Sequence, residues 1–140
     1  MKISILLPYK ENFSPSYAGA VSIFIKDTMN YSKFKENIIV YGNTNNKKKF
    51  NSNYVNLNFK KNLLKSSSKS YITEFLKKEK IVKSDIIEFH NRPTYLKYIL
   101  NLKYSKKVLY FHNDPLEMSG SKLIKERIYL TDNLDKIIFN

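Results

Sequence analysis

Residues 86–93 read IIEFHNRP, and residues 108–115 read VLYFHNDP. Each stretch opens with the apolar and aromatic residues of a buried β-strand and closes with His, Asn, a charged residue and Pro. The proline at position 93 suits the first turn of a helix, because its missing N–H has no hydrogen-bond partner there. Both stretches therefore predict a strand that passes through a short turn into the next element.

Short apolar runs alternate with segments of helical period along the whole chain. Apart from these two strands, apolar runs predict strands at residues 3–7, 38–41, 55–59 and 136–139. Apolar residues at helical spacing predict helices at about 19–34, after the serine-rich N-caps of 66–70, at 93–102 and at 121–130. The polar, cationic residues 44–49 are typical of a loop.

Continuous apolar strands that alternate with amphipathic helices are typical of a parallel sheet covered on both faces. We therefore expect an α/β fold, a Rossmann-like open and mainly parallel sheet with helices on both faces, formed by residues 1–140 as one domain. In such sheets ligands bind at the carboxyl ends of the strands. The sequence ends directly after an apolar run, which leads us to expect one half of a larger enzyme.

The composition excludes several classes of protein. The 140 residues fit one domain, and 42% hydrophobic residues are enough to form a core. The absence of Cys excludes a disulfide scaffold and a Cys-ligated metal centre. No apolar run approaches the ~20 residues of a membrane span, and the N-terminus lacks the long apolar region of a signal peptide. We therefore expect a cytoplasmic protein.

The net charge of +13 comes almost wholly from lysine, since Arg92 and Arg127 are the two arginines. Reading of DNA bases favours arginine, so we predict no specific nucleic-acid partner. A field of this sign attracts phosphorylated ligands and acidic membrane surfaces. Residues 47–50 and 59–65 mix lysines with apolar residues, which is typical of a membrane-binding patch and also of a solvated loop.

His90 and His112 are the two histidines of the chain, and each follows a predicted strand. If both strands are parallel, both rings lie at the carboxyl edge of the sheet, where His can bind hydroxyl groups and phosphates or carry a proton. The other reading is that His and Asn only shape the turns. The neighbouring polar residues Asn91, Arg92, Asn113 and Asp114 are further candidates for ligand binding.

The sequence favours neither a nucleophilic triad nor a metal or cofactor site. A Gly-x-Ser-x-Gly elbow and the glycine-rich phosphate loops are absent, and the chain has three glycines in all. His90, His112 and Asp114 include the residue types of a metal site, but Asp114 lies in a turn two residues from His112. We therefore predict no metal and no cofactor.

The loop between the first strand and the first helix is a second candidate site. It contains Tyr17 and ends in Gly19 and Ala20. Small residues at the start of a helix let an anionic ligand approach the backbone N–H groups. Alternatively, Gly19 serves only the geometry of the turn.

Taken together, these segments resemble the N-terminal domain of GT-B fold glycosyltransferases of family 4 (group 1). The likeness rests on residues 2–8 leading to 19–21, on 85–91, on 108–115 and on 135–139. It implies transfer of a sugar, with retention and without an obligate metal, from a nucleotide-sugar donor to a polysaccharide or glycolipid acceptor at the cell surface. Such enzymes often lie on the inner face of a membrane.

The resemblance also implies roles for single residues. His112 would be the catalytic residue, in contact with the transferred sugar or the donor phosphate, and Gly19 with Ala20 would lie on the phosphate side of the cleft. His90, Asn91 and Arg92 would line the acceptor side. The sequence departs from the family where Ala18-Gly19 replaces a Gly-Gly pair, and residues 1–140 do not include the donor-binding half, so we expect no activity from them alone.

A non-catalytic module that binds a phosphorylated or sugar ligand is the alternative function. A nucleic-acid-binding domain driven by net charge is a third and weaker hypothesis.

Overall fold

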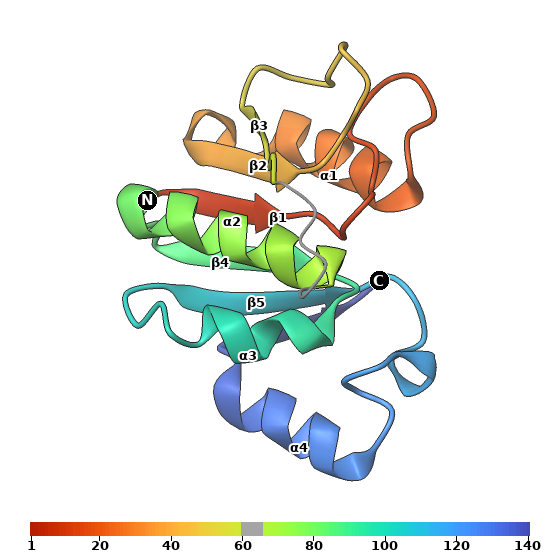
Figure 1. The fold of residues 1–140 in the computed structure, drawn as a ribbon, viewed down its shortest axis with the longest axis vertical. Coiled ribbons are helices and arrows are strands. Elements are labelled where there is room, and N and C mark those ends of the chain that lie inside the picture. Colours follow the sequence, from red (N-terminus) through yellow and green to blue (C-terminus); the bar gives the residue numbers. More distant parts are fainter. Residues whose placement is uncertain (60–65) are drawn as a thin grey trace.

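The computed structural model describes residues 1–59 and 66–140. These residues form one six-stranded sheet in the order β3-β2-β1-β4-β5-β6, and each neighbouring pair of strands runs parallel (Figure 1). The predicted Rossmann-like α/β fold is thereby confirmed. The strands and α-helices in chain order are β1 (Ile3–Leu6), α1 (Ala20–Tyr31), β2 (Ile38–Gly42), β3 (Tyr54–Asn56), α2 (Ser67–Val82), β4 (Ile86–His90), α3 (Leu96–Ile99), β5 (Lys106–Phe111), α4 (Ile124–Asn133) and β6 (Lys136–Phe139).

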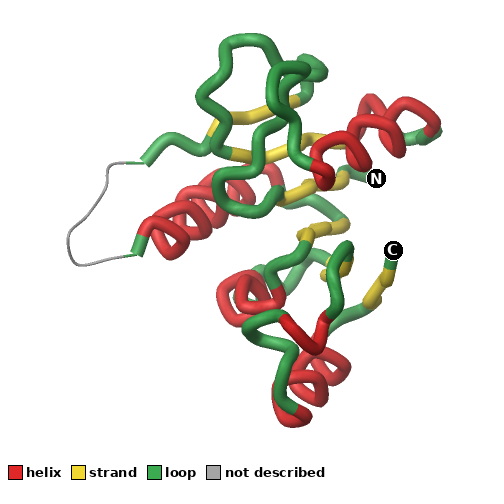
Figure 2. The backbone as a smooth tube through the Cα atoms, turned by 90° about the vertical axis from the view of Figure 1, so that its right-hand side faces the viewer, coloured by secondary structure: helices red, strands yellow, loops and turns green. Residues whose placement is uncertain are grey.

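Helices cover both faces of the sheet, as predicted (Figure 2). On one face, Val21, Ile25 and Met29 of α1 pack against Ile5 and Val40. On the other face, α2, α3 and α4 form the larger core, which includes Leu6, Tyr41, Ile72, Phe75, Phe89, Leu96, Ile99, Leu109 and Leu130. Successive strand residues alternate between these two cores, because side chains of a strand point to opposite faces.

The α1 side of the sheet is covered less fully toward β5 and β6. α1 reaches the neighbouring strands through Phe24, whose ring centroid lies 6.3 Å from that of His90 and 5.8 Å from that of Tyr110. Beyond Phe24, Val108 and Ile138 on the same face are half-buried. His90 and the other side chains on this face therefore lie between a packed core and a more open surface.

Several elements differ in extent from the prediction. The helices expected at about 19–34 and at 121–130 are α1 (Ala20–Tyr31) and α4 (Ile124–Asn133). The helix expected at 93–102 begins as a 3-10 turn (Pro93–Tyr95) and continues as the short α3. Tighter turn bonds follow it, since the Leu102 N–H donates to the carbonyl of Ile99 at 2.9 Å. The strand expected at 55–59 is β3 at Tyr54–Asn56, and the side chain of Asn56 accepts a bond of 2.9 Å from the backbone N–H of Thr44.

The carboxyl ends of β1, β4 and β5 meet at one edge of the sheet, where loops gather (Figure 2). From β1 the chain proceeds to β2 and β3 on one side, and then returns to β4 on the other side of β1. This reversal of strand order leaves a crevice outside the ends of β1 and β4, the usual place for a ligand in open α/β sheets.

Candidate functional site

An open cleft with a volume of about 440 Å³ lies at this reversal of strand order. Its walls come from the end of β1, the start of α1 and the loops after β4 and β5. The lining residues are Pro8, Glu11, Ala20, Val21, Asn91, Arg92, Asn113, Asp114, Glu117 and Met118. Five residues singled out from the sequence therefore line one cleft: Ala20, Asn91, Arg92, Asn113 and Asp114.

Asn91 ties together the two loops that form one wall of the cleft. Its side-chain amide donates to Oδ1 of Asn113 at 2.7 Å, and its Oδ1 accepts from the backbone N–H of His112 at 2.7 Å. Its own backbone has a positive φ of 50°, a conformation that Asn tolerates better than most residues. Much of the hydrogen-bonding capacity of Asn91 is thus used to shape the site.

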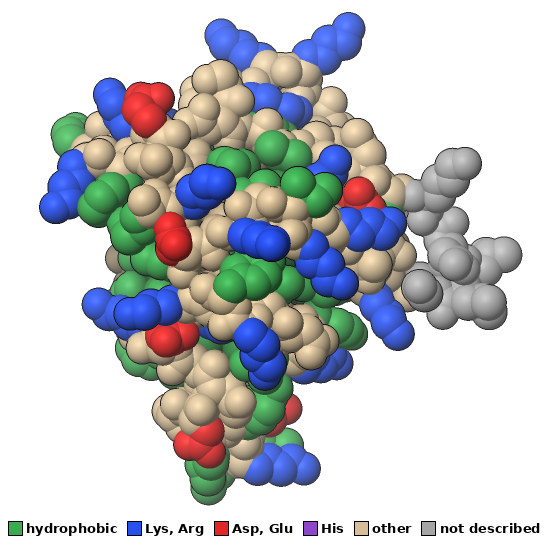
Figure 3. Space-filling view, turned by 90° about the vertical axis from the view of Figure 1, so that its left-hand side faces the viewer, with side chains coloured by type: hydrophobic (Ala, Val, Ile, Leu, Met, Phe, Trp, Pro, Cys, Tyr) green, Lys and Arg blue, Asp and Glu red, His purple; other side chains and the backbone are tan. Residues whose placement is uncertain are grey.

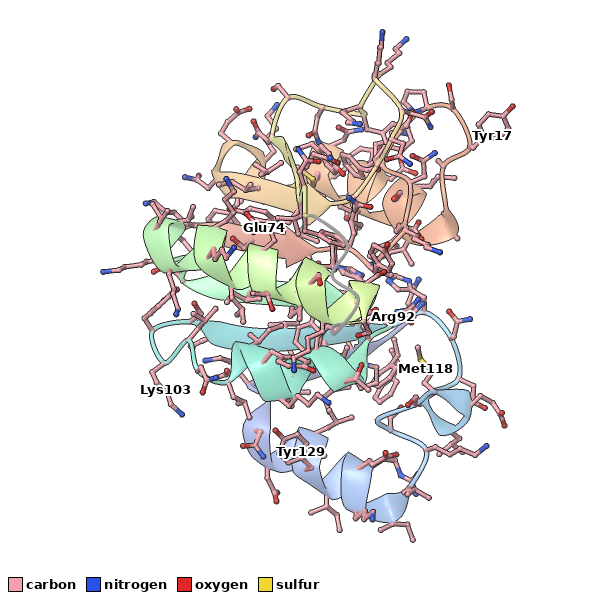
Figure 4. The ribbon with its side chains drawn as sticks, viewed as in Figure 1. Tyr17, Glu74, Arg92, Lys103, Met118 and Tyr129 are labelled. Atoms are coloured by element: carbon pink, nitrogen blue, oxygen red, sulfur yellow. The ribbon has the colours of Figure 1, made fainter. Side chains whose placement is uncertain are left out.

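Arg92 provides the positive charge of the cleft. One of its Nη atoms donates to the carbonyl of Asn91 at 2.7 Å, and its half-buried side chain lies at the carboxyl edge near Met118 (Figure 4). Among residues 1–59 and 66–140, no carboxylate lies within ion-pair distance of its guanidinium group. Since a guanidinium has five N–H donors, Arg92 retains donors for an anionic or hydroxylated ligand.

The N-terminus of α1 is occupied by a carboxylate of the protein itself. Oε1 of Glu11 accepts a hydrogen bond of 3.0 Å from the backbone N–H of Ser22. A Cβ atom at Gly19 would lie 2.0 Å from the same oxygen, so Gly19 leaves the space that Glu11 fills. An anionic ligand would reach the N–H groups near Gly19 and Ala20 only after Glu11 moved away, and their binding of phosphate stays a prediction.

Tyr17 is not brought together with the other candidate residues. Its side chain is 92% exposed, and it extends from the loop between β1 and α1 away from Arg92 (Figure 4). Its carbonyl accepts a hydrogen bond of 2.9 Å from the side chain of Asn12. The structure therefore gives Tyr17 a place outside the cleft.

A chain of hydrogen-bonded side chains lies beside the cleft, on the α1 side of the sheet. Oε1 of Glu88 lies 2.8 Å from Nε2 of His90, and Nδ1 of His90 lies 2.8 Å from Nε2 of His112. His90 is fully buried and uses both ring nitrogens in these bonds. His112 is half-buried and lies next to Asn113, but its ring is not part of the cleft wall.

Glu88 was not among the residues that the sequence singled out. The available signal was its spacing from His90, because residues two apart in a strand point to the same face. Only the structure shows that the carboxylate of Glu88 reaches the ring of His90.

Aromatic rings surround the two histidines. Tyr110 lies opposite His90 in the register of β4 and β5, and their nearly parallel rings have centroids 4.9 Å apart. The ring of Phe24 stands edge-on to that of His112, with centroids 4.8 Å apart. Burial lowers the pKa of His112 and the nearby His90 lowers it further, while the carboxylate of Glu88 acts in the opposite direction. Near pH 7 His112 is therefore a neutral imidazole.

The candidate metal ligands are engaged in other contacts. His90 and His112 bind each other, and Oδ1 of Asp114 accepts a hydrogen bond of 2.8 Å from the backbone N–H of Leu116. In the part of the chain that the structure describes, no three His, Asp or Glu side chains are placed to hold a metal ion.

The lysine-rich stretch 47–50 contains both exposed side chains and side chains that pack against the protein. Within residues 47–50, Phe50 packs edge-on against Phe13 with ring centroids 5.3 Å apart, and Nζ of Lys49 donates to the carbonyl of Thr44 at 3.0 Å. Of residues 59–65, Phe59 packs against Tyr9, while 60–65 lie outside the described residues. Figure 3 shows lysine and arginine side chains dispersed over the edge with the amino ends of the strands. Within the described ranges, no helix is long and apolar enough to cross a bilayer.

Comparisons with protein-family models, with curated proteins and with solved structures found no match to this chain. The fold and the geometry of the cleft are therefore the observations on which a functional hypothesis rests.

Proposed function

We propose that this chain forms the acceptor-side domain of a glycosyltransferase, which moves a sugar from a nucleotide-sugar donor to a hydroxyl group of a cell-surface polysaccharide or glycolipid. The observation that carries the proposal is the gathering of Arg92 and Asn113 in the cleft at the reversal of strand order, where open α/β sheets bind ligands, with His112 beside the cleft and bonded to Asn91. The resemblance of residues 85–91 and 108–115 to family 4 glycosyltransferases is the reason for proposing sugar transfer as the reaction at this site.

The cleft has the size and polarity that a sugar ligand requires. Its volume of about 440 Å³ falls in the ~300–1,000 Å³ range of small-molecule sites. Arg92 and Asn113 offer donors and an acceptor for sugar hydroxyls, and a guanidinium also suits a phosphate group. Asp114 and Glu117 add carboxylates, which accept hydrogen bonds from hydroxyl groups.

His112 supplies the acid–base chemistry of the proposal. Its lowered pKa keeps the ring neutral near pH 7, so that it can accept a proton from a hydroxyl group. Its backbone N–H is fixed by Asn91 at 2.7 Å, which joins the histidine to the cleft wall. The net charge of +13 would favour approach to anionic lipid at the inner membrane face, where glycolipid acceptors lie.

A ligand-binding module without chemistry is the second candidate, and one observation favours it. The ring of His112 is not part of the cleft wall, whereas Arg92 and the two asparagines are. A sugar or phosphorylated ligand in the cleft would then be bound without any reacting group in contact with it.

The test is a screen for hydrolysis or transfer of UDP-, GDP- and ADP-sugars by the protein that the complete reading frame encodes. We expect turnover of one donor class. Arg92→Ala removes charge-assisted hydrogen bonds worth ~1.5–3 kcal/mol, equal to about a 10–100-fold rise in KM. Arg127→Ala is the matched control, because Arg127 is the other arginine and donates to backbone carbonyls at Ser121 and Lys122.

The two candidates give different results. Turnover that His112→Ala abolishes while ligand affinity is retained supports the transferase. Binding of a sugar or nucleotide ligand that Arg92→Ala weakens, without turnover of any donor, supports the binding module and contradicts the transferase.

A further inference from the structure

Glu88, His90 and His112 form a continuous path of hydrogen bonds that leads from a carboxylate to the edge of the site. The two consecutive contacts are each 2.8 Å long, within the range of strong hydrogen bonds. At the outer end, the side-chain nitrogen of Asn140 lies 3.3 Å from Nδ1 of His112. His90 is fully buried, so its ring has no alternative partner in water.

The order of donors and acceptors along this path has one solution for neutral rings. An ionised carboxylate can only accept, so Nε2 of His90 carries the proton toward Glu88. Nδ1 of His90 is then an acceptor, and it receives the proton carried by Nε2 of His112. Nδ1 of His112 is left without a proton, which agrees with the amide donor of Asn140 beside it.

We propose that Glu88, acting through His90, fixes His112 in the tautomer whose Nδ1 accepts a proton, and so makes His112 the general base of the site. Glu88 and His90 are positioning residues in this account, and His112 is the residue that meets the substrate. The identity of the proton donor, an acceptor hydroxyl group, rests on the proposed function. The assignment of donors and acceptors along the path rests on the side-chain contacts alone.

In the reaction, the acceptor hydroxyl displaces the amide of Asn140 and donates its hydrogen bond to Nδ1 of His112. The hydroxyl oxygen forms its bond to the anomeric carbon on the face from which the phosphate leaves, so that the configuration is retained, and its proton passes to Nδ1. The bond between the anomeric carbon and the phosphate oxygen breaks, and its electron pair leaves with the nucleoside diphosphate. The imidazolium that forms is stabilised by the carboxylate of Glu88 through His90.

Few other titratable groups lie beside this path. Within the described residues, β4 contributes Glu88 and His90, and β5 contributes Tyr110, which is kept protonated because burial and Glu88 raise its pKa. By strand register, Lys106 of β5 and Lys136 of β6 lie on the same face of the sheet, both exposed and nearer the amino ends of their strands. α1 contributes the uncharged ring of Phe24, and the chain after β6 contributes the neutral amide of Asn140. Glu88 is therefore the group whose substitution changes the charge at His112 most directly.

The experiment is long-range ¹H–¹⁵N NMR of the imidazole nitrogens in the ¹⁵N-labelled chain, which reports the proton on each ring nitrogen. The chain has two histidines, so His112→Gln assigns both sets of signals. We expect a protonated Nε2 and an unprotonated Nδ1 in His112 of the wild-type protein at pH 7.5. In Glu88→Gln, which loses the charge, we expect the pKa of His112 to fall further.

Glu74→Gln is the matched control, because it removes the same charge on α2, on the far face of the sheet (Figure 4). Glu88→Asp retains the carboxylate and should retain part of the effect. A proton on Nδ1 of His112 in the wild type would overturn the proposal. This result comes from the wild-type spectrum, so it does not depend on whether any variant folds. Equal titration of His112 in the wild type and Glu88→Gln would also overturn it.

These outcomes are independent of the proposed function, because they need no substrate. The expected tautomer in a protein that turns over no nucleotide sugar would support the path and contradict the transferase. Transfer activity in a protein with the opposite tautomer would support the transferase and contradict the path.

Discussion

His90 ends β4 and His112 directly follows the neighbouring strand β5, 22 residues later in the sequence, and Nδ1 of His90 lies 2.8 Å from Nε2 of His112 in a hydrogen bond. The bond places a fully buried imidazole between a carboxylate and a half-buried imidazole at the edge of a cleft. The histidines are therefore more than turn residues, because one orients the other.

Protein stability should depend on pH through His112. Its pKa is lowered in the folded chain, so the unfolded chain binds more protons between the lowered pKa and the ordinary value of about 6.5. The free energy of unfolding should be greatest above pH ~6.5, fall as the pH decreases from there, and level off below the folded-state pKa. Urea unfolding of wild type and His112→Gln between pH 5 and 7.5 measures this difference.

The wild type should lose more stability over this range than His112→Gln, since the variant lacks one titrating group. Parallel curves for the two proteins would mean that the pKa of His112 is not lowered by folding.

The strands and the location of the site could be predicted from the sequence. Apolar runs such as 86–89 and 108–111 are strong signals of buried parallel strands, and the turn residues after them had to meet at one edge once the sheet was parallel. The same logic brought Arg92 and Asn113 into one cleft.

The contacts that organise the site depend on distant elements and could not be predicted. Glu11 reaches the start of α1 because its loop is held by Thr44, whose Oγ1 accepts from the N–H of Phe13 at 2.8 Å and donates to the carbonyl of Glu11 at 3.3 Å. Sequence spacing within the loop carries no information on this contact. The exposure of Tyr17 has the same origin, because local sequence does not determine which way a loop tip points.

Asn91→Ala should destabilise the protein by about 2–4 kcal/mol. The variant loses the bonds to Asn113 and to the N–H of His112, each worth ~1 kcal/mol, and places a residue less suited than Asn at a positive φ. Chemical denaturation measures the change. Asn101→Ala, in an exposed turn after α3, is the control and should stay within about 0.5 kcal/mol of the wild type.

Asn91→Gly separates the two causes. Glycine tolerates the positive φ but makes neither side-chain bond, so it should recover only part of the loss. Full recovery would show that the two bonds contribute nothing to stability.

Gly19→Ala and Glu11→Ala should be strongly non-additive. A methyl group at Gly19 occupies the place of the Glu11 carboxylate, so Gly19→Ala alone should displace Glu11 from the N–H of Ser22 and cost about 0.5–2 kcal/mol, the value of an N-terminal cap. Gly19 has an extended backbone with φ −77°, which alanine adopts without strain. In the Glu11→Ala protein, Gly19→Ala should therefore cost almost nothing.

A double-mutant cycle by thermal or chemical denaturation measures this coupling. Additive losses would mean that Glu11 does not cap α1 in solution.

The most direct test of the account is the pH dependence of sugar transfer by the complete protein, for the wild type, Glu88→Gln and Glu74→Gln. We predict that kcat of the wild type falls as the pH decreases and His112 becomes protonated. We also predict that Glu88→Gln lowers kcat by about 10²-fold, the lower range of general-base catalysis, with KM unchanged, and that Glu74→Gln matches the wild type. Transfer at the wild-type rate in Glu88→Gln and in His112→Ala would contradict the account, because the reaction would then proceed without this base.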